Sequence, residues 1–378
     1  MPVIYLDNNA TTRLDDRVLT AMLPFFTEQY ANAVSSHLFG LTIKEAVENA
    51  QQQIADLIGA RPTEIIFTSG ATESINFAIK GLGNNSRKHI VAVTTEHKAV
   101  LDTCPYMEKD GFTVTYLTVN KNGLIDLDEL KANITDDTLL VCIMLANNET
   151  GVIQPITEVV NIAHTKGALL LCDATQAVGK IPVNVKNLGI DLMPFSAHKF
   201  YGPKGVGGLF VSSKISKLLS PQIHGGGQQR NLRSGTLNVT GIIGLGKASE
   251  IALTDMQDDV LRIRDLRNSL EKELLKIKGS SINGDTDSRL PNTTNICFPG
   301  VNSEKLIIGL QNIAVSSGSA CSAVTTEPSH VLKAMGLSDA DALASIRFSL
   351  GRFTTAEEIE TAISKVTELV VKMRQQVI

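Results

Sequence analysis

Short apolar runs alternate with helix-like patterns over the first part of the chain. Helical patterns such as 156–167 lie between these runs, with apolar residues on one face of the expected helix. Continuous apolar strands that alternate with helices are typical of a parallel sheet covered on both faces. We therefore predict an α/β fold with a mostly parallel central sheet between helices. The apolar runs are 89–95, 113–119, 139–145, 168–173 and 206–211.

The pattern of apolar and polar residues changes in the last third of the chain. In 258–279, apolar residues recur at helical spacing along a highly charged segment, which predicts a long connecting helix. Beyond it, 293–300 predicts a strand, and 355–373 predicts a closing helix that Thr354 or Thr355 would cap. These patterns indicate a smaller α+β domain after the main sheet.

The length of the chain also favours two domains, because 378 residues exceed what one core usually supports. We predict a large domain over 15–255 and a small domain over 256–378. Residues 1–14 are expected to form an N-terminal arm that packs with the small domain.

Composition narrows the class of protein. A net charge of −4 gives no electrostatic reason to expect nucleic acid or an anionic membrane as a partner. The apolar runs are too short to span a bilayer, and the N-terminal residues lack the basic and apolar regions of a secretory signal. Five cysteines without paired spacing argue against a disulfide scaffold or a zinc module. We expect a cytoplasmic protein with reduced thiols and no metal site.

Polar residues gather where predicted strands end, the edge at which doubly wound sheets bind ligands. Each set has a structural alternative: Asp173 as a helix cap, 70–72 as an ordinary turn, and Lys199 as a solvated surface lysine. The sets are Asp173 with Gln176, Ser196 with His198 and Lys199, and Gly70 with Ala71 and Thr72.

One cofactor uses all three sets at once. Pyridoxal 5'-phosphate needs a lysine that bonds to its aldehyde and a carboxylate that keeps its ring nitrogen protonated. Its phosphate needs N–H donors, which a helix N-terminus supplies. Lys199, Asp173 and the turn at 70–72 offer one of each, so the combination predicts this cofactor.

One cysteine lies in an unusual setting. Cys142, Cys172 and Cys297 lie in or beside apolar runs, where a free thiol behaves as a small hydrophobe. Cys321 lies instead among Ser, Gly and Ala in the run SGSACSA. Either this thiol is incidental in a loop, or the loop exists to carry it.

Motifs in order along nearly the whole chain carry a family resemblance. The chain resembles the group I (NifS/IscS-like) cysteine desulfurases, within the fold-type I, class V aminotransferase-like enzymes that use pyridoxal phosphate. SAHKFYGPKG alone suggests the superfamily, whereas SSGSACS together with RFSLGR is much more specific. The motifs are YLDNNATT, GATES, TEHKAVLDTC, NNETGVIQPI, DATQAVGK, SAHKFYGPKG, HGGGQQRNLRSGT, SSGSACS and RFSLGRFTT.

The resemblance implies a role for each matched residue. Lys199 would bond to the cofactor, Asp173 would pair with its ring nitrogen, and His97 would stack on the ring and assist proton transfers. Cys321 would be the nucleophile that takes sulfur from L-cysteine as a persulfide and leaves L-alanine. The other implied contacts are Gln176 with the ring hydroxyl; Ala71, Thr72, Ser196 and His198 with the phosphate; Asn148 with the cofactor and, together with Arg347, with the substrate carboxylate; and Thr236 with the phosphate of the neighbouring subunit.

The resemblance also implies partners. These are a second copy in a homodimer with composite sites, and sulfur acceptors such as an iron–sulfur scaffold or a carrier for tRNA thiolation. Gln229 and Asn231 depart from the family, which often has Glu and Gly there.

The alternative function is a selenocysteine lyase or another class V aminotransferase-like enzyme, which needs no loop thiol. A third reading is a sulfur-carrier or scaffold subunit that mainly binds partners.

Overall fold

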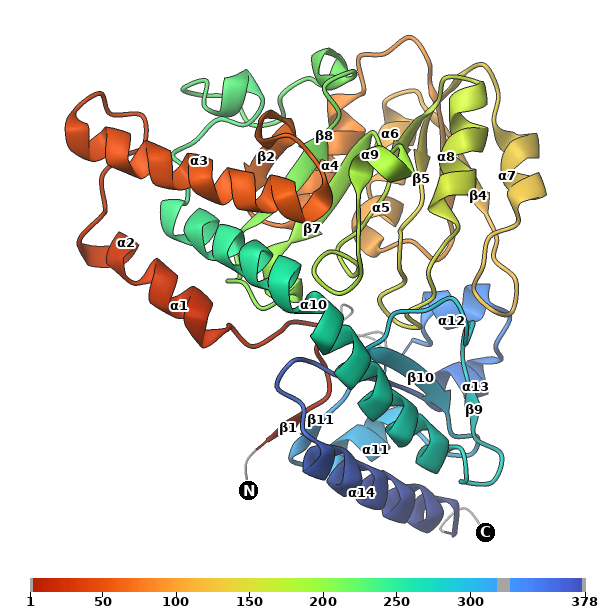
Figure 1. The fold of residues 1–378 in the computed structure, drawn as a ribbon. Coiled ribbons are helices and arrows are strands. Elements are labelled where there is room, and N and C mark those ends of the chain that lie inside the picture. Colours follow the sequence, from red (N-terminus) through yellow and green to blue (C-terminus); the bar gives the residue numbers. More distant parts are fainter. Residues whose placement is uncertain (1–2, 318–326, 376–378) are drawn as a thin grey trace.

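The computed structural model describes residues 3–317 and 327–375, and its largest element is a seven-stranded sheet (Figure 1). Strands β4, β3, β5, β6 and β7 are mutually parallel along the sheet, whereas β8 runs antiparallel to both β7 and β2. The prediction of a mostly parallel central sheet is therefore confirmed. In sheet order the strands are β2 (Ile65–Thr68), β8 (Gly207–Val211), β7 (Leu192–Ser196), β6 (Leu169–Leu171), β5 (Thr138–Cys142), β3 (His89–Val93) and β4 (Thr113–Leu117).

Helices cover both faces of this sheet, and the strand residues alternate between two cores. Ile66 and Ile90 pack with α4 (Ala71–Gly81), α5 (Lys98–Leu101) and α6 (Cys104–Lys109). On the opposite face, residues such as Phe67 and Val91 pack with a second set of helices. That set comprises α1 (Asp16–Met22), α3 (Leu38–Ile58), α7 (Leu127–Asn133), α8 (Ile156–Thr165), α9 (Val185–Leu188) and the first half of α10 (Val239–Leu274).

A smaller antiparallel sheet lies beside the large one. It contains β12 (Ser345–Ser349), β10 (Thr293–Cys297) and β9 (Ser281–Ile282), in that order. The N-terminal arm reaches this part of the molecule, because β1 (Ile4–Tyr5) pairs in parallel with β11 (Ile313–Ala314). Its Ile4 and Leu6 side chains are buried in the same core as the small sheet.

Four further helices and one short helix near the N-terminus complete the described chain. The closing helix begins with reciprocal capping: Thr355 Oγ1 accepts from Glu358 N, and Thr355 N donates to Glu358 Oε2. Of the two predicted caps, the structure therefore selects Thr355. None of the described helices combines the length and the apolar character that crossing a membrane requires. These helices are α2 (Pro24–Thr27), α11 (Ser303–Leu310), α12 (His330–Ala334), α13 (Asp339–Leu343) and α14 (Ala356–Gln375).

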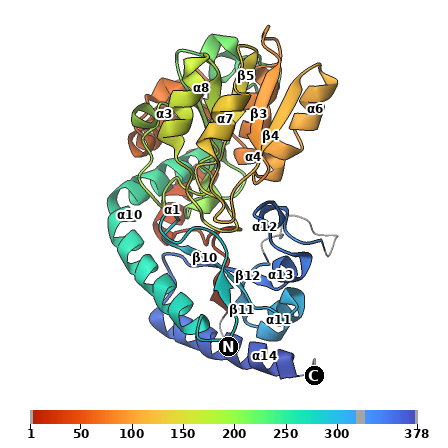
Figure 2. The same ribbon diagram turned by 90° about the vertical axis from the view of Figure 1, so that its right-hand side faces the viewer.

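Helix α10 connects the two sheets as one continuous helix of 36 residues (Figure 2). It begins well before the predicted connecting segment, and the boundary proposed at 255/256 falls inside it. In its first half, small residues allow close packing on neighbouring elements. A Cβ at Gly246 would lie 2.6 Å from Ala50 Cα of α3, and one at Gly244 would lie 2.8 Å from Pro203 Cγ.

Candidate active site

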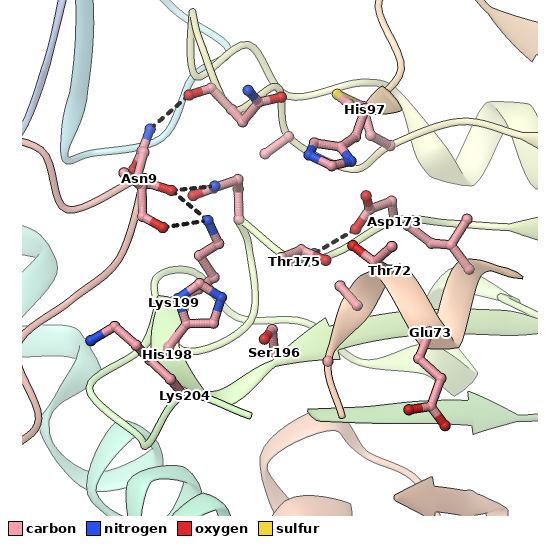
Figure 3. A pocket seen from close by; sticks show the side chains of 18 of the residues that line it. Asn9, Thr72, Glu73, His97, Asp173, Thr175, Ser196, His198, Lys199 and Lys204 are labelled. Carbon is pink, nitrogen blue, oxygen red and sulfur yellow. Dashed lines mark hydrogen bonds between the residues drawn. The ribbon is translucent and has the colours of Figure 1, made fainter. Parts of the chain in front are cut away.

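A cavity of about 510 Å³ opens where strands of the large sheet end. Its walls come from the segments that follow β5, β6 and β7, the first turn of α4, the N-terminal arm and β12 (Figure 3). This is the edge at which the sequence predicts a ligand site. The predicted site residues that line it are Ala71, Thr72, His97, Asn148, Asp173, Gln176, Ser196, His198, Lys199 and Arg347.

Two predicted site residues are not among the lining residues. Thr236 is exposed on the segment that follows the short 3-10 turn Gln229–Asn231 and does not border the cavity. Its contact with the phosphate of a neighbouring subunit stays a prediction. Cys321 lies outside the described residues, and its role as the nucleophile likewise stays a prediction.

Lys199 reaches into the cavity from a tight turn at the end of β7. Residues Ala197–Lys199 form a 3-10 turn that Phe200 N closes on Ala197 O at 3.1 Å. Lys199 Nζ donates to Asn9 O at 2.7 Å and to Ala10 O at 2.8 Å (Figure 3). The N-terminal arm therefore holds the amine at the carboxyl edge of the sheet.

The first turn of α4 borders the cavity. Its N-cap, Gly70, has φ 154° and ψ −178° and provides no side-chain cap, so N–H groups of the first turn face the cavity. Glycine suits this backbone, and a Cβ there would lie 3.4 Å from Ser196 Oγ. The helix dipole and the hydroxyls of Thr72 and Ser196 favour a phosphate or carboxylate at this position.

His198 lies on the same side of the cavity as a neutral ring. Burial, together with the positive charges of Lys199, Lys204 and Lys180, lowers its pKa to about 4. Its Nδ1 lies 3.0 Å from Thr11 Oγ1. At neutral pH the ring has one N–H donor and one acceptor.

His97 and Asp173 face the cavity from the ends of two other strands (Figure 3). His97 caps α5, and its Nδ1 accepts a hydrogen bond from Ala99 N at 3.0 Å. A neutral His97 must therefore carry its proton on Nε2. Asp173 Oδ1 accepts from Thr175 N at 2.9 Å, so this carboxylate both caps a local turn and lines the cavity.

Comparison with known proteins identifies the family. Residues 4–361 match the model of the Aminotransferase class-V family. Cysteine desulfurase IscS of Salmonella schwarzengrund (strain CVM19633) is 50% identical over 377 residues, which cover 98% of this chain and 93% of that protein. The chain belongs to the class-V aminotransferases and, within them, to the cysteine desulfurases.

Solved structures agree with this placement in the cysteine desulfurases. A NifS-like protein superposes with a TM-score of 0.92 and 40% identity, covering 98% of this chain and 99% of that one. SspA in complex with cysteine superposes with a TM-score of 0.82 and 36% identity, covering 93% of this chain and 100% of that one. The predicted fold and family are confirmed.

Arg347 is a buried member of the desulfurase cavity. Its side chain is 3% exposed and forms an ion pair of 2.6 Å with Asp7 Oδ1. Its Nη1 donates to Asn148 O at 3.0 Å, whereas its Nε is buried without a hydrogen-bond partner among the described residues. The contact of Arg347 with a substrate carboxylate stays a prediction.

Sequence analysis did not assign roles to three residues that build the desulfurase site. Asn9 and Asp7 belong to the N-terminal arm, whose contact with the cavity depends on long-range folding. Lys180 is buried behind the cavity and donates to Asn9 and Gln176. The available signal for Lys180 was its position four residues after Gln176, which places the two side chains close together in a helical turn.

Proposed function

We propose that this chain uses pyridoxal 5'-phosphate to transfer sulfur from L-cysteine to the thiol of Cys321. The products are L-alanine and a persulfide on Cys321. The observation that carries this proposal is the single cavity that brings Lys199, Asp173 and Arg347 together. Membership of the cysteine desulfurases supports the same reaction.

The residues present fit the cofactor. The uncapped start of α4 would hold the phosphate, with Ala71 N, Thr72, Ser196 and the neutral His198 as donors. Asp173 would pair with the ring nitrogen, and Lys199 would bond to the aldehyde. Bound pyridoxal phosphate would draw electrons from the α-carbon of an amino-acid substrate.

Two side chains are suited to move protons in this cavity. Lys199 Nζ would remove or return the substrate's α-proton, since its amine lies at the cavity wall on two carbonyl acceptors. His97 would assist at Nε2, because Nδ1 is occupied by Ala99 N.

Arg347 and Asn148 would hold the substrate carboxylate. Arg347 lines the cavity, and a guanidinium can form charge-assisted bonds with a carboxylate. Such a bond is worth about 2 kcal/mol, which corresponds to tens of fold in affinity. Asp7 would keep part of the guanidinium charge neutralised and the fork in place.

The described cysteines are poorly suited to take the sulfur. Burial raises the pKa of Cys104 to about 12 and raises the pKa values of Cys142, Cys172 and Cys297 as well. A thiol of raised pKa supplies little of the nucleophilic thiolate. This leaves Cys321 as the candidate, with its thiolate attacking the substrate sulfur as the Cβ–S bond breaks.

A second copy of this chain is the first partner that we propose. Large apolar side chains are exposed along α1, α2 and α3, which lie at one side of the molecule (Figure 1). Exposed apolar surface of this kind favours association, and a homodimer would bring Thr236 to a neighbouring phosphate site. The exposed side chains are Leu19, Leu23, Phe26, Tyr30, Val34, Leu38, Phe39 and Leu41.

The persulfide requires a further acceptor outside the cavity. We propose acceptor proteins in the cytoplasm, such as an iron–sulfur scaffold or a carrier for tRNA thiolation. Transfer of the terminal sulfur to an acceptor thiol would regenerate the Cys321 thiol.

The test is to incubate the purified protein with pyridoxal phosphate, L-cysteine and a thiol reductant, and to measure alanine and sulfide together. We expect equal amounts of both from the wild type. Cys321→Ser should retain the cofactor and bind cysteine but form neither product, because a hydroxyl is not a comparable nucleophile at neutral pH.

Cys297→Ser is the matched control for this experiment. It changes a buried cysteine whose Sγ donates to Asp341 O at 3.4 Å and which does not line the cavity, so turnover should be largely retained. Alanine formation by Cys321→Ser at near the wild-type rate would contradict the nucleophile role. That result would favour a lyase that releases sulfur without a protein thiol.

A further inference from the structure

Lys180 is a buried lysine beside the cavity, and among the described residues its Nζ donates hydrogen bonds only to neutral amide oxygens. It is 9% exposed, and its Nζ donates to Gln176 Oε1 at 2.7 Å and to Asn9 Oδ1 at 3.1 Å. Burial lowers its pKa well below the ordinary value, and the nearby charges of Lys199 and Arg347 lower it further. Burying a lysine side chain in this position costs folding free energy, which suggests that the lysine has a functional role.

The contacts of Gln176 fix the orientation of its amide. Lys180 is a donor toward Oε1, and the main-chain oxygen of Asn9, which can only accept, lies 2.9 Å from Nε2. Both neighbours therefore require the same orientation, with oxygen toward Lys180 and nitrogen toward Asn9. The second N–H of Gln176 then remains as a donor for the cavity that the residue lines, because Oε1 faces Lys180.

Asn9 connects this pair to Lys199. Its main-chain oxygen accepts from both Gln176 Nε2 and Lys199 Nζ. Its side-chain orientation is also fixed, because Nδ2 donates to Asn148 O at 3.2 Å, and that carbonyl can only accept. Asn9 Oδ1 must therefore face Lys180, so the lysine binds two amides of fixed orientation.

We propose that Lys180 is a positioning residue that holds Gln176 so that it presents an N–H donor, and no acceptor, to the ring oxygen of the cofactor. This inference rests on the proposed function, because it concerns pyridoxal phosphate in the same cavity. Without Lys180, Gln176 Oε1 would be buried without a donor. Asn9 O would then be the one described contact left to orient the amide, so its N–H would be held less firmly toward the cofactor.

Holding this donor at the ring oxygen would change the proton affinity of the nitrogen that joins Lys199 to the bound cofactor. A donor at the ring oxygen stabilises negative charge there and weakens proton binding at the adjacent nitrogen, through which Lys199 would hold the cofactor. The other titratable groups around the cavity are Glu73, His97, Asp173, His198, Lys204 and Arg347, and Asp259 lines a small space next to Lys180. None of these is changed by a substitution at Lys180.

The test is a pH titration of the cofactor's absorption in the loaded protein, without substrate. Lys180→Met should raise the pH midpoint by about one unit relative to wild type. Exposed Lys186→Met is the matched control and should not move the midpoint. A purely structural lysine would change thermal stability and leave the midpoint in place.

A double-mutant comparison separates positioning from a direct effect of charge. In a Gln176→Ala background, Lys180→Met should move the midpoint by no more than about a few tenths of a unit, because the residue through which it acts is gone. A full shift in that background would overturn the proposal, as would an unchanged midpoint in Lys180→Met.

Gln176→Glu provides a second variant in case Lys180→Met does not fold. Its carboxylate has no N–H donor, so the midpoint should again rise, and an unchanged midpoint would overturn the inference. Wild-type protein that takes up no pyridoxal phosphate would overturn the proposed function and this inference together. Loaded wild type with unshifted variants would overturn this inference alone.

Discussion

Glu96 is a buried carboxyl group directly before His97 in the chain. Its Oε1 accepts a hydrogen bond from Met144 N at 2.7 Å, whereas its Oε2 is buried without a hydrogen-bond partner among the described residues. Burial raises its pKa well above the ordinary value, and the nearby charge of Asp173 raises it further. Burial therefore favours the neutral, protonated form of the Glu96 carboxyl group in the folded protein.

A dependence of stability on pH follows from Glu96. The unfolded chain loses this proton near pH 4.3, while the folded chain keeps it to higher pH, so the stability contributed by Glu96 falls as pH rises. Glu96→Gln keeps the acceptor for Met144 N and removes the ionisation. The free energy of unfolding of Glu96→Gln should therefore rise relative to that of wild type as the pH rises above about 5, by at most about 1.4 kcal/mol per pH unit.

Urea unfolding at several pH values measures this difference. Exposed Glu108→Gln is the matched control for the change of side chain. Parallel pH profiles for wild type and Glu96→Gln would show that Glu96 ionises in the folded protein.

Sequence patterns located most cavity residues because those residues follow apolar strands or belong to recognisable motifs. Lys199 and Asp173 stand at strand ends, where the edge of a doubly wound sheet is expected to bind ligands. The partners Asp7, Asn9 and Lys180 were missed for a physical reason. Apart from the contact of Lys180 with Gln176, their contacts join segments far apart in the chain, and local sequence patterns do not show which distant polar groups will meet.

Gln229 and Asn231 stand where the family often has Glu and Gly, and Gln229 contacts strand β2. Gln229 Oε1 accepts from Phe67 N at 2.6 Å, and its Nε2 donates to Phe67 O at 2.8 Å. Phe67 belongs to β2, an edge strand, so the amide satisfies main-chain groups that an edge strand leaves unpaired. Gln229, Arg230 and Asn231 all have positive φ, which is a costly backbone for residues other than glycine.

Gln229→Glu should weaken the contact between this segment and β2 and so destabilise the fold. A carboxylate can accept from Phe67 N, but it cannot donate to Phe67 O and is repelled by it. The expected loss is about 1–3 kcal/mol of unfolding free energy, measured as a lower Tm or by denaturant unfolding.

Gln228→Glu is the control for this prediction. The neighbouring glutamine uses its oxygen to accept from Gly235 N at 2.8 Å, and a carboxylate can do the same. Equal stability of the Gln229 and Gln228 variants would argue that the contact with Phe67 contributes little.

At the scale of elements, the sequence predicted the strands better than it predicted α10. The run 139–145 extends beyond β5 because Ile143 N and Leu145 N still bond to Leu171 O and Asp173 O. The charged half of α10 has a clear helical period, but its first half contains several glycines, which lower intrinsic helix propensity. Close packing on α3 keeps that half helical, and packing of this kind is not a local property.

At the scale of the molecule, Arg352 connects parts that are distant in the chain. Its guanidinium pairs with Asp15 at 2.9 Å and with Asp259 of α10 at 2.7 Å. It also lies 4.4 Å from the centroid of the Tyr201 ring, and its main-chain N donates to Tyr201 Oη at 2.6 Å. Both carboxylates are largely buried, so they depend on this partner.

Arg352→Met should lower the free energy of unfolding by about 3 kcal/mol, because it leaves buried carboxylate surface without its cation. Lys365→Met is the control, since the exposed Lys365–Glu368 pair should contribute no more than about 1 kcal/mol. Thermal unfolding of both variants measures the contrast. Equal Tm values for Arg352→Met and Lys365→Met would mean that Arg17, the other partner of Asp15, is sufficient to stabilise the Asp15 carboxylate.

The length of α10 gives the molecule a lever arm. At 1.5 Å per residue, a helix of 36 residues extends about 54 Å, and a tilt of about 5° would sweep its far end through about 5 Å. One end packs beneath the sheet that carries Lys199, and the other packs against the sheet that carries Arg347. The stiffness of α10 therefore affects how constant the separation of Lys199 and Arg347 stays, and with it the width of the cavity that both residues line.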